Sequence, residues 1–422
     1  MARLRLGDIG KVSMCKRVLK HETLPEGDIP FYKISTFGGR ADVFIARELY
    51  DNYRLKYSYP KCGDILISAA GTVGKTVVYN GSPAYFQDSN IVWIANNEKV
   101  VLNRYLYYFY KTEPWRTTNG STISRIYNEN LRDIEIDVPS LNTQSKIASV
   151  LEKLDEKIDI NNKINAELEA TARDLYNYWF VQFEFPDDNQ RPYKTAGGAM
   201  VYNEELKRKI PATWSAGGLN RFIANEKTGD WGKESAQANY SRKVTCIRGT
   251  DLNSILQTQQ INAPERFILE KNTHKLLQKN DIVIEISGGS PTQSTGRAAY
   301  ITDKVMSMFD NPLICSNFCK AISVKKDLHL FFVYYLWQQL YDNGVFFGYE
   351  GKTSGIKNLL YENFISSYEV VLPDEEILTK FNDAIGPLSS AIVANRKEAM
   401  RLLSVRDWLL PMLMNGQLKV VD

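Results

Sequence analysis

Residues 69–76 come closest to a motif of enzyme chemistry. Gly74, Lys75 and Thr76 end this stretch as a phosphate-binding P-loop ends, but Ala69 stands where that motif has its first glycine. A P-loop also leads into a helix, whose first N–H groups hold the phosphates, whereas the residues after Thr76 follow a strand pattern. The sequence therefore favours a glycine-bearing hairpin with Lys75 at its tip over a nucleotide site.

A second set of residues resembles a nuclease site. Asp187, Glu205 and Lys207 formally match the spacing by which many nucleases hold a divalent metal and position a water. That chemistry needs all three groups on adjoining strands, but Glu205 and Lys207 fall in a polar stretch, residues 203–209, that predicts a short helix. A magnesium-dependent nuclease is therefore kept only as an alternative.

Two further chemistries lack residues that they need. Methyl transfer to a base requires a glycine-rich cofactor loop and an Asn-Pro-Pro-aromatic clamp, and Asn311-Pro312-Leu313 lacks the second proline and the aromatic residue. The three histidines (His21, His274, His329) have no nearby Ser or Cys with which to form a triad. We therefore expect no catalytic site, and no metal or cofactor bound by this chain.

Composition indicates a large protein of the cytoplasm. A chain of 422 residues with 44% hydrophobic residues can fill more than one core, and 52 Lys and Arg against 49 Asp and Glu permit a polyanionic partner without proving one. No apolar run approaches the length of a membrane span, and the first residues lack the apolar core of a signal peptide. The cysteines have no zinc-site spacing and indicate buried thiols in a reducing compartment; they are Cys15, Cys62, Cys246, Cys315 and Cys319.

The strongest pattern is an internal repeat. Residues 138–179 align without a gap with residues 372–413, at an interval of 234 residues, and a proline opens a long helical pattern in both copies. Apolar residues recur at alternating steps of four and three, which is the heptad signature of helices that share a packed seam. The seam residues are Ile147, Leu151, Leu154, Ile158, Asn161, Leu168 and Leu175 in the first copy, and Phe381, Ile385, Leu388, Ile392, Asn395, Leu402 and Leu409 in the second.

Polar residues in the seams carry their own predictions. Asn161 aligns with Asn395, and a buried asparagine at such a position either fixes the register of the helices or is tolerated polarity; we favour the register role. Arg406 weakens the packing unless it finds a partner. Gly386-Pro387 predicts a kink or a fresh helix start. The first helix, residues 142–180 with Thr143 as its cap, would be roughly 50 to 55 Å long.

The repeat continues upstream in a looser form. Asp-Ile-Leu-Ile at 64–67 resembles Asp-Ile-Val-Ile at 281–284, and both lead into a glycine-bearing loop with a cation, Lys75 or Arg297. Ser89-Asn90 recurs as Ser316-Asn317, and residues 127–131 recur as 361–364. Short β-branched runs predict mainly strands in residues 1–140, with a helix at 103–111, and strands again up to residue 372, with a helix near 328–340.

Matched polar loops in the two copies offer side chains that could read base edges. An ordinary solvated loop is the competing interpretation for each loop taken singly, and the matched placement favours function. The candidates for DNA binding are Lys75, Arg116, Asn119, Ser121, Arg125, Gln293, Arg297, Lys352, Thr353 and Lys357.

Several of these segments together resemble one known family over essentially the full length. They are residues 64–67 before the Gly-Thr-Val-Gly-Lys loop, residues 139–147 and 174–183 at the two ends of the first helix, and the connection from Tyr193-Lys194 to Trp214. The chain resembles the specificity subunit of a type I restriction-modification system. That connection is typical of the family, which is a second reason to doubt the nuclease alternative.

The resemblance implies an α+β fold and a recognition role. Two similar strand-rich target recognition domains would be separated by two long helices forming an antiparallel coiled coil, with a pseudo-two-fold internal repeat. The expected segments are a first recognition domain (1–140), a central helix (141–185), a connector with the second recognition domain (186–372) and a C-terminal helix (373–422).

The resemblance also implies partners. Each domain would read one half of a bipartite site in double-stranded DNA, while the helices set the spacer and dock two methyltransferase subunits that bring S-adenosylmethionine. Motor-nuclease subunits, with ATP and magnesium, would complete the assembly. The chain itself would not be an enzyme. Besides the nuclease, the remaining alternative is a coiled-coil scaffold whose flanking domains bind proteins instead of DNA.

Overall fold

The computed structural model describes residues 2–115, 125–256, 261–290, 292–353 and 356–420. The chain forms two compact units, which are described separately. Unit 1 holds residues 1–157 with 402–422, and unit 2 holds residues 158–401. The two longest helices, α5 (Leu141–Tyr176) and α10 (Glu375–Met414), each contribute residues to both units. The expected four-segment division follows the sequence repeat instead of these units and stays a prediction.

Unit 1 is built on a four-stranded antiparallel sheet of order β2-β9-β6-β7. Its central strand β9 carries Ile91, Val92, Trp93 and Ile94, all buried, because both faces of the sheet are covered. A second sheet has the order β3-β5-β4-β8, and β1 pairs with β10. The strands are β1 (Ala2–Arg5), β2 (Gly10–Ser13), β3 (Thr23–Leu24), β4 (Ile29–Tyr32), β5 (Val43–Ile45), β6 (Ile65–Ser68), β7 (Thr76–Val78), β8 (Tyr85–Phe86), β9 (Ile91–Asn96) and β10 (Glu135–Val138).

Unit 2 contains a sheet of order β14-β21-β17-β19, which is also antiparallel. Smaller sheets are β16-β15-β20, β18-β23-β22, β13-β24 and β11-β12. The strands are β11 (Met200–Asn203), β12 (Arg208–Pro211), β13 (Ser215–Gly218), β14 (Ile223–Thr228), β15 (Tyr240–Ile247), β16 (Glu265–Leu269), β17 (Asp281–Glu285), β18 (Ser287–Gly288), β19 (Ala298–Tyr300), β20 (Leu313–Cys315), β21 (Cys319–Val324), β22 (Glu350–Thr353), β23 (Ile356–Leu359) and β24 (Glu369–Leu372).

Shorter helices accompany the sheets of both units. The helix expected at residues 103–111 is α3 (Asn103–Lys111), and the one expected near 328–340 is α8 (Leu330–Asp342), so both predictions are confirmed. The others are α1 (Leu6–Ile9), α2 (Arg47–Lys56), α4 (Asn128–Asp133), α6 (Leu252–Leu256), α7 (Asp303–Met306) and α9 (Tyr361–Ser367).

The two sheets share one frame, which confirms the internal repeat. The order β2-β9-β6-β7 corresponds strand by strand to β14-β21-β17-β19, and the pair β1-β10 corresponds to β13-β24. Ser68 on β6 lies opposite Ile91, and Glu285 on β17 lies opposite Cys319. This register makes Asn90 the counterpart of Phe318, so the sequence match of Ser89-Asn90 with Ser316-Asn317 is wrong by one residue.

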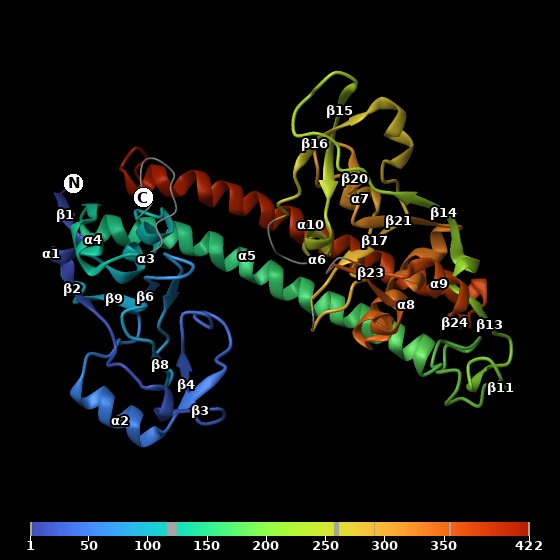
Figure 1. Ribbon diagram of the computed structural model, residues 1–422, viewed down its shortest axis with the longest axis horizontal. Helices are drawn as coiled ribbons and strands as arrows, with labels where there is room; N and C mark the ends of the chain where they lie inside the picture. Colours follow the sequence, from blue (N-terminus) through green and yellow to red (C-terminus); the bar gives the residue numbers. More distant parts are fainter. Residues whose placement is uncertain (1, 116–124, 257–260, 291, 354–355, 421–422) are drawn as a thin grey trace. The chain divides into compact units, whose positions relative to one another are not determined.

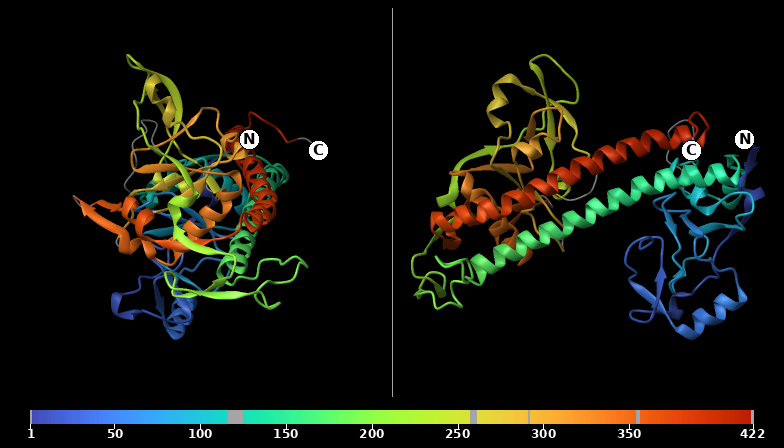
Figure 2. Two further views of the ribbon diagram at one scale, coloured as in Figure 1. Left: turned by 90° about the vertical axis from the view of Figure 1, so that its right-hand side faces the viewer. Right: turned by 180° about the vertical axis from the view of Figure 1, so that it is seen from behind.

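Helices α5 and α10 pack antiparallel in each unit, and Figures 1 and 2 show them side by side. In unit 1, Ile147 and Leu151 share a core with Leu410 and Leu413. In unit 2, Phe180 lies 4.9 Å from Phe381 between ring centroids, while Asn165, earlier in α5, contacts Ile392, later in α10. The antiparallel coiled coil predicted for the helices is therefore confirmed.

Three local predictions are wrong. Helix α5 begins at Leu141, and the Ser140 hydroxyl, not Thr143, caps it by accepting the Thr143 N–H at 3.3 Å. Helix α10 runs from Glu375 to Met414 without a fresh start at Pro387. Residues 203–209 form the turn and adjoining strand ends of the β11-β12 hairpin instead of a helix, because the left-handed Lys207 (φ 51°) reverses the chain there.

Replacing Leu151 by alanine tests the weight of the helix seam in unit 1. The fully buried Leu151 side chain would leave a cavity beside α10, so the variant is expected to lose about 2 to 5 kcal/mol of unfolding free energy in chemical denaturation. Leu55→Ala is the control, because Leu55 is 86% exposed, and should change it by less than about 0.5 kcal/mol. Equal effects of the two changes would contradict the packing described.

Candidate functional site

Lys75 lies in the turn between β6 and β7. Its ammonium donates to the Phe37 carbonyl at 2.6 Å. Gly74 has φ +85°, and a Cβ there would lie 2.1 Å from the Trp115 ring nitrogen, so the ring packs against the glycine. Because strand β7 follows at once, the glycine-bearing hairpin is confirmed and a P-loop is excluded.

Arg125 belongs to the segment that lies beside this hairpin. Its guanidinium donates to the Ser89 carbonyl at 3.1 Å, and the backbone N–H of Ile126 donates to the Ala69 carbonyl at 2.8 Å. The first two candidate loops of unit 1 thus meet at the end of β6. Three of their predicted DNA-binding residues, Arg116, Asn119 and Ser121, lie outside the described residues.

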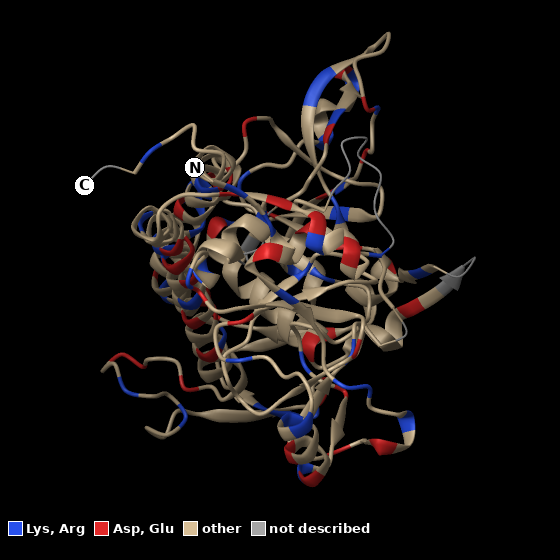
Figure 3. Cartoon of the chain, turned by 90° about the vertical axis from the view of Figure 1, so that its left-hand side faces the viewer, with Lys and Arg blue, Asp and Glu red and all other residues tan. Residues whose placement is uncertain are grey.

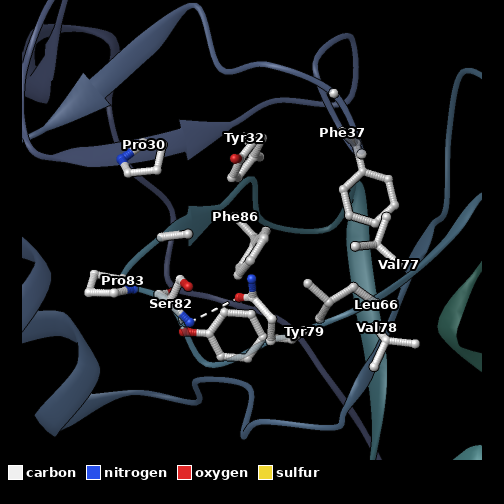
Figure 4. A pocket seen from close by; sticks show the side chains of 14 residues that line it. Pro30, Tyr32, Phe37, Leu66, Val77, Val78, Tyr79, Ser82, Pro83 and Phe86 are labelled. Atoms are coloured by element: carbon white, nitrogen blue, oxygen red, sulfur yellow. Dashed lines mark hydrogen bonds between the residues drawn. The ribbon is translucent and has the colours of Figure 1, made fainter. Parts of the chain in front are cut away.

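A pocket of about 320 Å³ adjoins the Lys75 hairpin and is lined mainly by apolar and aromatic side chains (Figure 4). Phe37, whose carbonyl accepts from Lys75, forms part of its wall together with Val77. Tyr32 and Phe86 stack with ring centroids 5.8 Å apart. The hairpin is therefore held by an aromatic neighbourhood on one side and by Trp115 on the other.

In unit 2 the matching loops are tied together by ion pairs. Arg297 donates through Nε (2.9 Å) and Nη2 (2.5 Å) to the buried carboxylate of Glu285. Lys357 pairs with Glu350 at 2.9 Å, and the Glu350 carboxylate also accepts the Thr295 N–H at 2.8 Å. Because β18 pairs with β23, the loop after β17 and the β22-β23 hairpin form one surface.

The other unit 2 candidates lie on the same surface. The Gln293 amide donates to the Tyr341 hydroxyl at 3.1 Å. Lys352 and Thr353 belong to β22, and the structure does not describe their side chains. Since the charges of Arg297 and Lys357 are neutralised within the protein, they position the loops more than they attract phosphate. Direct contact of any candidate with DNA stays a prediction.

Both units use one backbone bond to join these loops. The Leu359 N–H donates to the Ile286 carbonyl at 2.8 Å, as Ile126 donates to Ala69 in unit 1. We call each joined pair of loops a loop pair. Sequence reasoning missed Trp231, Arg248 and Phe318, which line a hollow beside the unit 2 loop pair. Only the strand frame, which sets Phe318 opposite Asn90 in the repeat, could have found Phe318.

The helix seam has an apolar majority and a polar layer. Asn165 donates to the Ile392 carbonyl at 3.1 Å, Asn395 donates to the Asn165 side-chain oxygen at 2.9 Å, and Asn161 donates to Glu398 at 2.8 Å. The fourteen predicted seam residues are all buried or half-buried. Specific bonds of this kind favour the register role over tolerated polarity.

Arg406, predicted to weaken the seam, has a partner in unit 1. Its Nη1 donates to one oxygen of Asp155 at 2.9 Å, and the Tyr108 hydroxyl donates to the other at 2.8 Å. One carboxylate thus links α3, α5 and α10. Charges are otherwise mixed: Figure 3 shows Lys and Arg interspersed with Asp and Glu along the helices and the strand-rich parts.

Comparison with known proteins agrees with this architecture. Residues 1–170 match the family described as the type I restriction modification DNA specificity domain. The type I restriction enzyme MjaIX specificity subunit of Methanocaldococcus jannaschii is 27% identical over 98% of this chain and 96% of its own length. The chain belongs to the family of type I restriction-modification specificity subunits.

Two further relatives refine the picture. A Haemophilus influenzae protein provisionally named a type I restriction enzyme specificity subunit is 56% identical over 152 residues, which span 36% of this chain and 40% of that protein. The crystal structure of the type I restriction-modification S subunit from M. genitalium has the same fold, with a TM-score of 0.54 and 16% identity over 98% of this chain and 96% of that one.

A specificity subunit is a non-catalytic recognition subunit, and the nuclease alternative is wrong. Asp187 accepts the Arg191 backbone N–H at 2.8 Å and pairs with the Arg191 guanidinium at 3.0 Å, which holds the pKa of that carboxyl below its usual range. Glu205 and Lys207 lie in the exposed turn of the β11-β12 hairpin, so the three groups do not share adjoining strands. No helix in the described part of the specificity subunit is long and apolar enough to cross a bilayer.

Unit 2 of the subunit also buries an acid beside the seam. Burial raises the pKa of Glu169 to about 7, against the opposing charges of Arg173 and Arg396. Burial likewise lowers the pKa of Arg396, on α10, to about 10. A carboxyl whose pKa is higher in the folded than in the unfolded state favours folding when protonated, and this contribution is lost as pH rises through 7.

Glu169→Gln tests this site through the pH dependence of stability. Glutamine keeps the shape of the protonated acid but does not ionise, so it should become more stable than the native subunit as pH rises from 5 to 8, by up to about 3 kcal/mol. The measurement is the unfolding free energy in urea at each pH. A constant difference between the two proteins across that range would contradict the raised pKa.

Proposed function

We propose that each strand-rich part of the subunit reads one half of a bipartite site in double-stranded DNA through its loop pair. The helix pair α5-α10 sets the spacer between the halves and docks two methyltransferase subunits. S-adenosylmethionine then belongs to those partners, and ATP and magnesium belong to motor-nuclease subunits, in a cytoplasmic assembly. Membership in a type I family implies assembly with other restriction-modification subunits; these finer roles are the proposal.

One observation carries the proposal: the two units hold unlike side chains in a single frame. Ser68, Lys75 and Asn90 of unit 1 correspond to Glu285, Arg297 and Phe318 of unit 2, while the backbone bond that joins the loops is the same. A conserved frame with different side chains suits two readers of different sequences, because base edges are discriminated by side-chain donors, acceptors and apolar groups.

Docking of partner subunits is supported by exposed apolar residues on the helix pair. Val405 and Trp408 stand one turn apart on α10, and the Trp408 side chain is 56% exposed. Ile160 and Ile164, also exposed, stand one turn apart on α5. Such residues contribute nothing to the seam, and large apolar side chains left in water are typical of a binding surface for another protein.

The competing function is a scaffold that binds only proteins. Phosphate neutralisation makes DNA affinity fall steeply with salt, whereas contacts between proteins have no such fixed dependence. Sequence-specific, salt-dependent binding of a duplex by the assembled complex would therefore exclude the scaffold.

Exchange of residues 1–140 for those of a subunit with another specificity tests the modular reading. The frame of unit 1 stays, and only its loops and side chains change, so one half of the target should change and the other half should not. Mapping methylated bases in host DNA by single-molecule sequencing gives the readout. A change in both halves, or in neither, would contradict the proposal.

Trp408→Ala combined with Val405→Ser tests the docking surface. Loss of an aromatic anchor should weaken binding of the methyltransferase subunits by about 2 kcal/mol, or roughly thirty-fold. Titration calorimetry measures it, with the exposed Leu55→Ala as the matched control. Unchanged affinity, with folding verified by circular dichroism, would place the docking surface elsewhere.

A further inference from the structure

A hollow of about 640 Å³ opens beside the loop pair of unit 2. Its walls come from the segment after β14, the turn before α6, the loop after β17 and the residues before β21. Its volume falls within the range of small-molecule sites, roughly 300 to 1,000 Å³. Flat contact with the outside of a duplex does not require such a hollow.

Two aromatic side chains stand in this hollow with much of their surface in water. Trp231 is 37% exposed and Phe318 is 56% exposed. The guanidinium of Arg266 lies 4.1 Å from the Trp231 ring centroid, and the buried Arg266 is itself paired with Glu234 at 3.0 Å. A cation held against one face of the indole fixes the ring as a platform for another planar group.

The charges around the hollow are already paired. Arg248 donates through Nε and Nη2 to Asp251 at 2.8 and 2.9 Å, and Arg297 makes its two bonds to Glu285. A phosphate would find no surplus positive charge in these pairs. A neutral planar ring fits them better, because it needs stacking partners and a few polar groups at its edge.

Glycine keeps one wall of the hollow open and rigid. A Cβ at Gly249 or at Gly288 would lie 2.5 Å from Oε1 of Glu285, so neither position can carry a side chain while the Glu285–Arg297 pair stands. The buried ion pair therefore shapes the hollow as well as the loop. Asn317, also in the lining, offers an amide that can donate to or accept from the edge of a ring.

We propose that this hollow receives one nucleobase displaced from the DNA stack, with its ring on Trp231 and its rim closed by Phe318. The inference rests on the proposed reading of DNA by unit 2. Proteins that hold a displaced base stack it on aromatic or apolar side chains and contact its edge, and this hollow supplies both kinds of group. The displaced base would lie in the half-site read by unit 2.

Unit 1 provides an internal contrast. Its frame has Asn90 in place of Phe318 and Ser68 in place of Glu285, so neither the aromatic rim nor the ion pair that shapes the wall is repeated. We therefore assign base displacement to unit 2, and a base in the unit 1 half-site should not behave in the same way.

The test uses the full chain assembled with its methyltransferase subunits, on the duplex whose methylated positions have been mapped. Each base in turn is left without a partner by an abasic site opposite it, and the dissociation constant is measured. A base that must leave the stack binds tighter once unpaired, so one position in the unit 2 half should gain about ten-fold in affinity. Trp231→Ala and, separately, Phe318→Ala should abolish that gain.

Phe347→Ala is the matched control, because Phe347 is an exposed aromatic residue of unit 2 that does not line the hollow; the gain should survive it. A position that gains affinity in every variant is a base displaced for the methyltransferase subunits. If no gain depends on Trp231 or Phe318, the hollow does not receive a base, although the native complex still reads its site. If the native complex shows no preference for the mapped duplex, the proposed function itself fails.

Discussion

Packing of helix α10 against α5 is the interaction on which both units depend. In unit 1, Leu410, Leu413 and Met414 complete a core that also contains residues of β6, β9 and α3. In unit 2, Phe381 and Ile385 close a core with Tyr176 and Phe180. Neither strand-rich part is covered without the second helix. The helix pair is therefore at once the structural core of each unit and the element that joins their reading loops to it.

Hydrogen bonds and ion pairs, more than free charges, define the reading surfaces. The loop pairs are closed by the same backbone bond, and the cations that the sequence suggested as DNA contacts are mostly engaged by the protein: Lys75 by a carbonyl, Arg297 and Lys357 by carboxylates. This arrangement agrees with the small net charge of +3. Specificity then comes from rigid loop shape and from a few open side chains, while partner subunits can supply much of the attraction for phosphate.

The sequence predicted what recurs and what is periodic. The heptad seam, the 234-residue interval and the strand before each cation-bearing loop follow from burial patterns that repeat along the chain, so α5, α10, β6 and β17 were all foreseen. Features set by a single contact were not. The turn at Lys207 depends on one left-handed residue, and the partner of Arg406 depends on a carboxylate far away in the chain.

The candidate site shows the same limit. Lys75, Arg125 and Arg297 could be chosen from their residue types, but their bonds to Phe37, Ser89 and Glu285 could not. The hollow was missed because its parts come from four separated segments, and because the sequence match of the two copies was one residue out of register at Phe318. Counting strand positions from β17 and β21, instead of matching letters, corrects that register.

Asp155 meets Arg406 across an interval of 251 residues. During synthesis on the ribosome, at about 5 to 20 residues per second, unit 1 therefore stays open along its α5 face for tens of seconds after its own strands have been made. Throughout that interval Ile147 and Leu151 face water or a chaperone. The order of translation thus makes the first reading head the last to be finished, and premature termination anywhere before residue 402 would leave it uncovered.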